Sequence, residues 1–169
     1  RTKSPMVHAP SISEKLPIDE LLYLLTKYLT IMTIICESYD GIVAEILGDG
    51  LLVFWNTPDD IENHASKAAA AALAQQYAMK ELSLEFEELL TKYGCDPKLE
   101  IRIGLNTGKV LTGNIGSEIK MKFGCLGDPI NLASRLEGLC KLYGTNIIMS
   151  NDTKELLDPR GKFQYRNLD

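Results

Sequence analysis

The sequence predicts an α+β fold in which helices pack on a sheet that keeps at least one face exposed. Three patterns indicate it: apolar residues recur at helical spacing over residues 17–39, an alanine-rich stretch precedes Leu90, and apolar residues alternate from Leu99 to Leu105. With 169 residues and 45% hydrophobic content, the chain can form one domain with a substantial core.

Two long helices have recognisable ends. Pro17 lacks only an N–H that the first turn does not use, so it begins the first helix, which ends near Gly41. Residues 56–60 (Asn-Thr-Pro-Asp-Asp) predict the start of the second helix, and Gly94 predicts its end. Residues 1–12 show no clear periodicity and are expected to be a loop or a weak edge.

Two hairpins are expected. Residues 41–47 and 51–55 are apolar and strand-like, and they flank a turn centred on Asp49. Residues 99–105 form a half-buried strand that turns into a second strand at residues 109–111.

The remaining elements are shorter. In order, we expect a turn at 112–116, a strand at 123–126, a helix at 130–143, a strand at 145–149, a helix capped by Ser150 or Asn151 that ends at Asp158-Pro159, and a strand from 163 to 165.

Composition excludes several functions. A net charge of −5 and a pI near 5.1 argue against binding nucleic acid or an anionic membrane. The four cysteines are far apart and include no Cys-x-x-Cys pair, which favours free thiols in a reducing compartment. No apolar run is expected to reach transmembrane length, so the sequence predicts a cytoplasmic domain without direct membrane contact, either free or as the intracellular part of a larger membrane protein.

The turn Gly48-Asp49-Gly50 is a candidate metal site. Its glycines permit φ > 0 and close backbone approach, which leaves the carboxylate uncrowded at a strand end. Such a carboxylate suits Mg²⁺ that carries the phosphates of a nucleotide. The alternative is an ordinary β-turn with an exposed aspartate.

The segment from Gly127 to Glu137 is a candidate for substrate contacts. Asn131 and Arg135 are four residues apart, so on a helix they share one face. An amide beside a guanidinium suits a ribose oxygen next to a phosphorus centre that gains negative charge. The alternative is a solvated helix face.

Together these motifs resemble the class III nucleotidyl cyclases, the catalytic domains of adenylate and guanylate cyclases. The matching segments follow the order of that family and are 13–17, 46–55, 101–110, 113–116 and 127–137. The resemblance implies one domain over residues 1–169, with a ferredoxin-like α/β sandwich and a mostly antiparallel sheet. It also implies an enzyme that converts a purine nucleoside triphosphate to its 3′,5′-cyclic monophosphate and pyrophosphate.

The resemblance also implies a role for each candidate residue. Asp49 matches one of the aspartates that hold two Mg²⁺ or Mn²⁺ ions, and Arg102 matches an arginine that contacts phosphates in some members. Asn131 and Arg135 match the residues that orient the ribose and stabilise the transition state. In the family the sites form between two protomers, so a homodimer or a heterodimer is expected.

The base-reading positions of the family fall on Glu45 and Gly124, with Cys125 adjacent. A carboxylate can accept hydrogen bonds from guanine N1–H and the 2-amino group, whereas adenine N1 is only an acceptor. Glu45 therefore favours GTP, and ATP is the alternative substrate.

Two departures from the family pattern leave alternatives open. The first metal aspartate of the family falls on or near Pro5, and its glycine and phenylalanine fall on His8 and Ala9. The chain also ends at Asp169, before the expected final strands and a lysine that contacts the triphosphate. The domain is therefore an incomplete or rearranged cyclase, a degenerate one, or a non-catalytic module that dimerises with a partner and regulates it.

Overall fold

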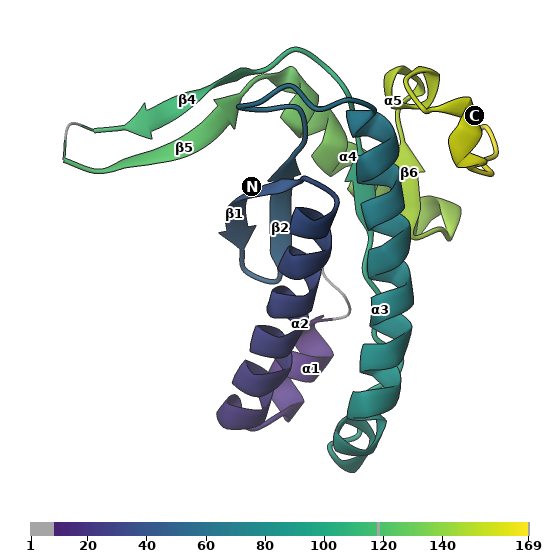
Figure 1. Cartoon of the computed structure of the whole chain (residues 1–169). Coiled ribbons are helices and arrows are strands. Elements are labelled where there is room, and N and C mark those ends of the chain that lie inside the picture. Colours follow the sequence, from purple (N-terminus) through teal and green to yellow (C-terminus); the bar gives the residue numbers. More distant parts are fainter. Residues whose placement is uncertain (1–8, 118, 169) are drawn as a thin grey trace.

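The computed structural model describes residues 9–117 and 119–168 and confirms the α+β class. The elements in chain order are α1 (Ala9–Lys15), α2 (Ile18–Ser38), β1 (Ile42–Leu47), β2 (Gly50–Phe54), α3 (His64–Lys92), β3 (Ile103–Leu105), β4 (Leu111–Gly116), β5 (Met121–Leu126), α4 (Asp128–Tyr143), β6 (Ile147–Met149), α5 (Asn151–Glu155) and the 3₁₀ turn η1 (Pro159–Gly161). Figure 1 shows α2 and α3 side by side, with the strands and α4 gathered near one end of the pair.

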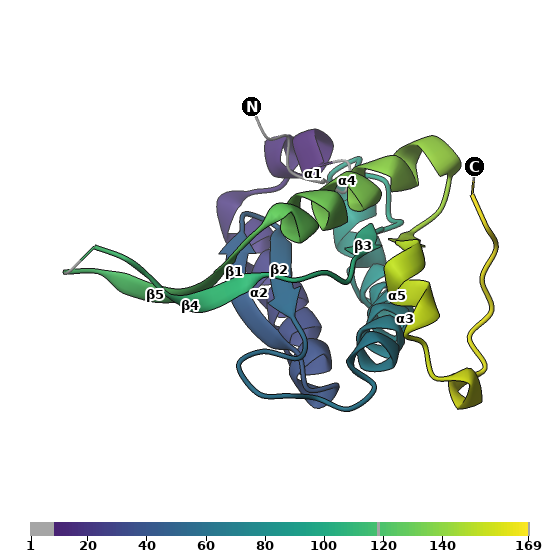
Figure 2. The same cartoon turned by 90° about the horizontal axis from the view of Figure 1, so that it is seen from above.

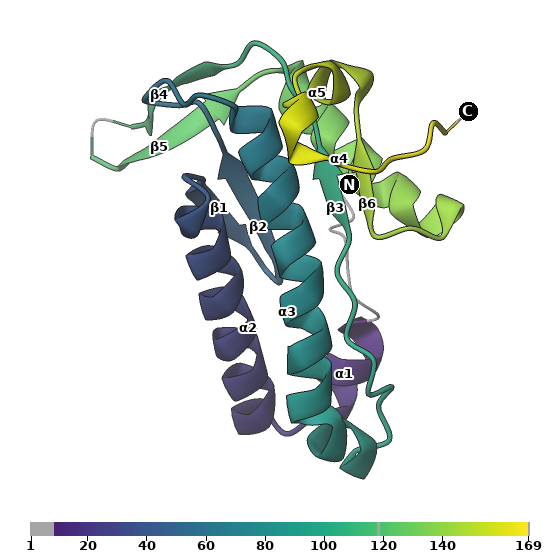
Figure 3. The same ribbon diagram turned by 45° about the vertical axis from the view of Figure 1, so that its right-hand side comes forward.

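The main core lies between α1, α2, α3 and the segment that leads into β3, an arrangement that Figure 3 shows from the side. α2 follows Pro17, and α3 ends where Gly94 adopts a φ of 66°, both as predicted. The buried apolar residues of this core are Ile12, Leu16, Leu24, Met32, Met79, Leu82, Phe86, Leu90, Cys95, Leu99 and Ile101. The alternation predicted from Leu99 therefore holds, although only its last three residues are paired as a strand.

α2 corrects one expectation about apolar length. It has 21 residues and a mean hydropathy of 1.3 over its most apolar window, so by length and composition it could cross a membrane. Here Leu24, Met32 and Cys36 of α2 are buried within the protein. A core helix satisfies the same criteria as a spanning helix, so the pattern alone does not distinguish them.

The strands form three separate pairs. β1 and β2 are antiparallel around the turn at Gly48 and Asp49, which confirms the first hairpin. β3 pairs in parallel with β6, and β4 pairs antiparallel with β5.

The second predicted hairpin is wrong, because residues 103–105 pair with β6 and not with residues 109–111. The predicted turn at 112–116 lies within β4 instead. Gly113 in this stretch faces Gly124 across the β4–β5 ladder, so glycines that indicate a turn in the sequence serve here as small cross-strand partners.

Several element boundaries also differ from prediction, and among them α5 ends at Glu155, before the predicted Asp158-Pro159. Residues from Ala9 onward are helical and not a loop, while residues 163–165 form no strand in the described chain. α3 begins at His64, later than predicted from residues 56–60. There the side chain of Asn56 accepts a hydrogen bond of 2.6 Å from the backbone N–H of Ile61, which stabilises a turn and not a helix start.

The β4–β5 hairpin projects from the body of the protein as an arm, which is clearest in Figure 2. Leu111 and Met121, on the two strands, are 70% and 63% exposed. The arm is held mainly by its own ladder of backbone hydrogen bonds, since Leu111, Met121 and Leu126 remain exposed outside the core.

Candidate active site

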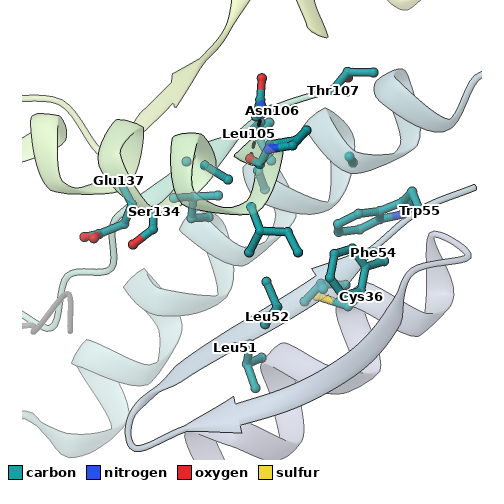
Figure 4. Close-up of a pocket in the computed structure, with 18 of the residues that line it drawn as sticks. Cys36, Leu51, Leu52, Phe54, Trp55, Leu105, Asn106, Thr107, Ser134 and Glu137 are labelled. Atoms are coloured by element: carbon teal, nitrogen blue, oxygen red, sulfur yellow. Dashed lines mark hydrogen bonds between the residues drawn. The ribbon is translucent and has the colours of Figure 1, made fainter. Parts of the chain in front are cut away.

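A cleft of about 980 Å³ separates the β1–β2 hairpin from β3 and α4. Its walls come from β2 and from α2 and α3 on one side, and from β3 and α4 on the other (Figure 4). Asp49 and Asn131, distant in the sequence, both line this cleft. The predicted metal ligand and one predicted catalytic residue therefore lie on one concave surface.

Asp49 lies in the turn of the first hairpin, as predicted, and is partly buried. Burial raises the pKa of Tyr28 on α2 to about 12, and the nearby negative charge of Asp49 contributes to this rise.

α4 carries the amide and guanidinium predicted to contact substrate. It begins at Asp128, and Pro129 lies in its first turn, where its missing N–H has no cost. Asn131 and Arg135 are both exposed on this helix, and neither has a hydrogen-bond or ion-pair partner among residues 9–117 and 119–168. Arg135 is outside the lining of the 980 Å³ cleft, so this cleft does not unite all of the predicted catalytic side chains.

The two predicted base-reading positions, Glu45 and Gly124, come together with the adjacent Cys125. Glu45, Gly124 and Cys125 line a second cavity of about 170 Å³ between β1 and β5. The β1–β2 register shifts between Val43 and Glu45, which marks a bulge at Ala44. A bulge re-aims the residue that follows it, and here that residue is Glu45.

Arg102 is directed to a partner within its own chain. Its Nε donates a 2.9 Å hydrogen bond to Oε1 of Glu137 on α4, and only 24% and 11% of the two side chains are exposed. Glu137 is therefore paired with Arg102 and not with Arg135, its neighbour on α4. A phosphate contact by Arg102 stays a prediction.

Sequence reasoning missed Glu137 and Asn106 as parts of this region. Glu137 is 8% exposed, and Asn106 donates from Nδ2 to the backbone oxygen of Pro129 at 2.9 Å. The available signal was that Arg102, Gly104 and Asn106 alternate along one strand and so share one face. That face meets α4.

The described residues meet only the minimum requirement for a divalent cation. Asp49 supplies one carboxylate, and no cluster of three His, Cys, Asp or Glu side chains able to hold a metal occurs in the described part of the chain. Pro5 and His8, where the family pattern was compared, lie outside the described residues. One carboxylate together with substrate phosphates is a common environment for Mg²⁺, so Asp49 fits a cation that arrives with a nucleotide.

Known proteins share the sequence pattern and the fold of this chain. Residues 6–169 match the family described as "Adenylate and Guanylate cyclase catalytic domain". Adenylate cyclase 1 of Rhizobium meliloti (strain 1021) is 30% identical over 83% of this chain, and the adenylate cyclase of Anabaena cylindrica is 28% identical over 94%. The chain spans only 20% and 30% of the length of these relatives.

Two solved structures show the same fold. The guanylyl cyclase Cya2 superimposes with a TM-score of 0.78 at 34% identity, over 92% of this chain and 75% of its own. The adenylyl cyclase CyaB from P. aeruginosa gives a TM-score of 0.77 at 32% identity, over 87% of this chain and 73% of its own. The chain thus belongs to the family of adenylate and guanylate cyclase catalytic domains.

Proposed function

We propose that this domain cyclises a purine nucleoside triphosphate with a preference for GTP over ATP. The observation that carries the preference is that Glu45 and Cys125 line one small cavity. A carboxylate in that cavity can accept from the two guanine donors, whereas it faces only an acceptor at N1 of adenine. A relative of 25% identity, the guanylate cyclase domain of RhGC from Catenaria anguillulae, was solved in complex with GTP.

The proposed reaction is attack of the ribose 3′-oxygen on the α-phosphorus, which forms the cyclic ester and breaks the bond to pyrophosphate. Asn131 holds the ribose, and Arg135 donates to the phosphate oxygens as negative charge accumulates on them. Asp49 would hold the divalent cation, Mg²⁺ or Mn²⁺, and the cation would neutralise part of the phosphate charge. The protein residues thus orient the two reacting groups in line, which is the main requirement of phosphoryl transfer.

We further propose that the site is shared between two protomers. Arg135 is exposed and lies outside the lining of the cleft that contains Asp49 of the same chain. In a dimer, Asp49 of one protomer can face Asn131 and Arg135 of the other. A homodimer would then contain two identical sites. In a heterodimer with another cyclase domain, each site would combine the metal ligand of one domain with the ribose and phosphate contacts of the other.

The test compares turnover of GTP and ATP with Mn²⁺ or Mg²⁺, measured as cyclic nucleotide formed. We expect cyclic GMP to predominate, and Glu45→Lys to shift the ratio of kcat/KM toward ATP. Glu100→Lys is the matched control, since Glu100 is an exposed glutamate whose ion pair with Lys98 lies outside both cavities. A wild-type preference for ATP would overturn the assignment of GTP as substrate. If dimeric protein forms neither cyclic GMP nor cyclic AMP, the proposal that the domain is an enzyme is overturned.

A second candidate is a non-catalytic module that dimerises with an active cyclase domain and regulates it. The single carboxylate among the metal-site residues described favours this candidate. Calorimetric binding of a nucleotide without any turnover, together with activation of a mixed dimer, would support it over the first.

A further inference from the structure

We infer that Arg102, Gly104 and Asn106 form a three-point contact that sets the position and rotation of α4, and that they thereby position Asn131 and Arg135. These three residues alternate along the strand segment that contains β3, so they share one face of it. The role for Asn131 and Arg135 rests on the proposed function, whereas the placement of α4 does not.

The first contact is the ion pair between Arg102 and Glu137. Its Nε–Oε1 distance is 2.9 Å, and Glu137 is 8% exposed. Removing one residue of a largely buried ion pair destabilises the folded state substantially, because the charge that remains is poorly solvated. This contact therefore fixes the C-terminal half of α4 against the strand.

The second contact is close packing at Gly104. A Cβ atom at this position would lie 2.0 Å from the backbone oxygen of Ala133 and 2.5 Å from the backbone nitrogen of Glu137. These are backbone atoms of α4, so they cannot move aside without moving the helix. Only glycine lets the strand and helix approach this closely.

The third contact joins Asn106 to the first turn of α4. Its Nδ2 donates to the backbone oxygen of Pro129 at 2.9 Å. The Oδ1 of Asn106 is buried and has no hydrogen-bond partner in the described structure, so the bond to Pro129 is what orients the amide. This contact holds the N-terminal end of the helix.

The three contacts are matched in spacing. Alternate residues of a strand are about 6.6 Å apart, and residues four apart on a helix rise about 6 Å. Positions 102, 104 and 106 thus meet positions 137, 133 and 129 in turn, with the strand and helix running in opposite directions. The contact fixes both the axial position and the rotation of α4.

The opposite face of α4 carries the substrate-contacting residues. Asn131 and Arg135 lie two residues after Pro129 and Ala133, about 200° away around the helix, and both are exposed. A rotation or shift at the packed face therefore moves both side chains at the exposed face. Arg102, Gly104 and Asn106 act through α4 and are positioning residues.

The experiment measures kcat, KM and hydrogen exchange for Gly104→Ala and Glu137→Gln. We expect kcat to fall about 10- to 100-fold, because a displacement of about 1 Å is enough to misalign reacting groups. KM should change by less than about threefold, because the interaction lost acts mainly in the transition state. Amide exchange should accelerate in residues 128–143 and stay unchanged in α2.

Each variant has a matched control. Gly138→Ala places a Cβ on α4 itself where no atom lies within 4 Å, and Glu100→Gln removes an exposed ion pair that lies outside both cavities. Both controls should retain wild-type kcat, and neither should accelerate exchange in α4. The double variant Arg102→Gln/Glu137→Gln should be no less active than Glu137→Gln, since the two residues act as one unit.

The outcomes separate this inference from the proposed function. If wild-type protein forms no cyclic nucleotide, the proposed function fails, and faster exchange of α4 in both variants still supports the positioning contact. Unchanged exchange of α4 in both variants overturns it. The positioning contact is also overturned if Arg102→Gln raises KM while Glu137→Gln keeps wild-type kcat and wild-type amide exchange. That result would assign Arg102 to a phosphate contact.

Discussion

The α2–α3 core is closely packed, whereas the region of the proposed site is open. By the site region we mean Asp49, Asn131, Arg135 and the β4–β5 arm. In the core, Met32 and Leu90 are 1% and 0% exposed. In the site region, Arg135 is exposed without a described ion-pair partner, and Leu111 of the arm is 70% exposed.

This difference indicates that most of the residues that stabilise the core and the residues proposed to contact substrate lie in separate parts of the chain. Close packing makes core positions sensitive to a change of volume, because the surrounding side chains relax only partly. Substitutions at exposed positions usually change stability little, and Asn131 and Arg135 of the proposed site are exposed. The proposed ligand Asp49 is partly buried. Substitutions in the two regions should therefore have different consequences.

The largest expected effect is a loss of activity from Asp49→Ala. We expect kcat/KM to fall about a thousandfold, because the cation that neutralises the phosphates loses its carboxylate ligand. The melting temperature should stay within about 2 °C of wild type. Asp40→Ala, which removes an exposed aspartate paired with Lys67, is the control and should keep its activity.

In the core, Leu90→Ala should lower the free energy of unfolding by about 3 kcal/mol, through lost burial and the cavity that remains. Urea denaturation followed by circular dichroism measures this change. Leu84→Ala on the same helix should cost less than about 0.5 kcal/mol, since Leu84 is 67% exposed. Equal costs for the two variants would contradict the division between core and surface.

The arm should affect association more than folding. Met121→Asp places a charge on a side chain that is 63% exposed, and we expect dimerisation to weaken about tenfold while monomer stability is unchanged. Sedimentation equilibrium measures both the mass and the dissociation constant. If Leu84→Asp on α3 weakens association equally, the arm is not the dimer contact.

The smallest expected effect concerns thiol reactivity. Burial raises the pKa of Cys36 from 9.0 to about 11, whereas Cys125 is only partly buried on the arm. At pH 8, Cys125 should therefore react with a disulfide reagent first, and Cys36 should react only as the protein unfolds. Cys125→Ala should remove the fast phase.

The same raised pKa predicts a dependence of stability on pH. A group whose pKa is higher in the folded state stabilises the folded protein fully at pH values below its pKa in the unfolded chain. This stabilisation is lost as the pH rises through the pKa of the folded state. The contribution of Cys36 should therefore decline between pH 9 and 11. Cys36→Ala should show a smaller decline in melting temperature over that range than wild type.

The sequence alone determined the local elements whose signals are short-range. The hairpin at Asp49, the helix after Pro17, the end of α3 at Gly94 and the Ser150 cap of α5 all follow from turn and cap chemistry, which depends on neighbouring residues. The face shared by Asn131 and Arg135 likewise follows from helical spacing.

Tertiary structure decided which elements pair and which side chains meet. The parallel pairing of β3 with β6 joins residues more than 40 apart, and no local pattern encodes that choice. The partner of Arg102 could not be read from the sequence either, because an arginine pairs with whichever carboxylate the packing of a helix brings near. Burial against β3 selected Glu137, and the same packing left Arg135 exposed.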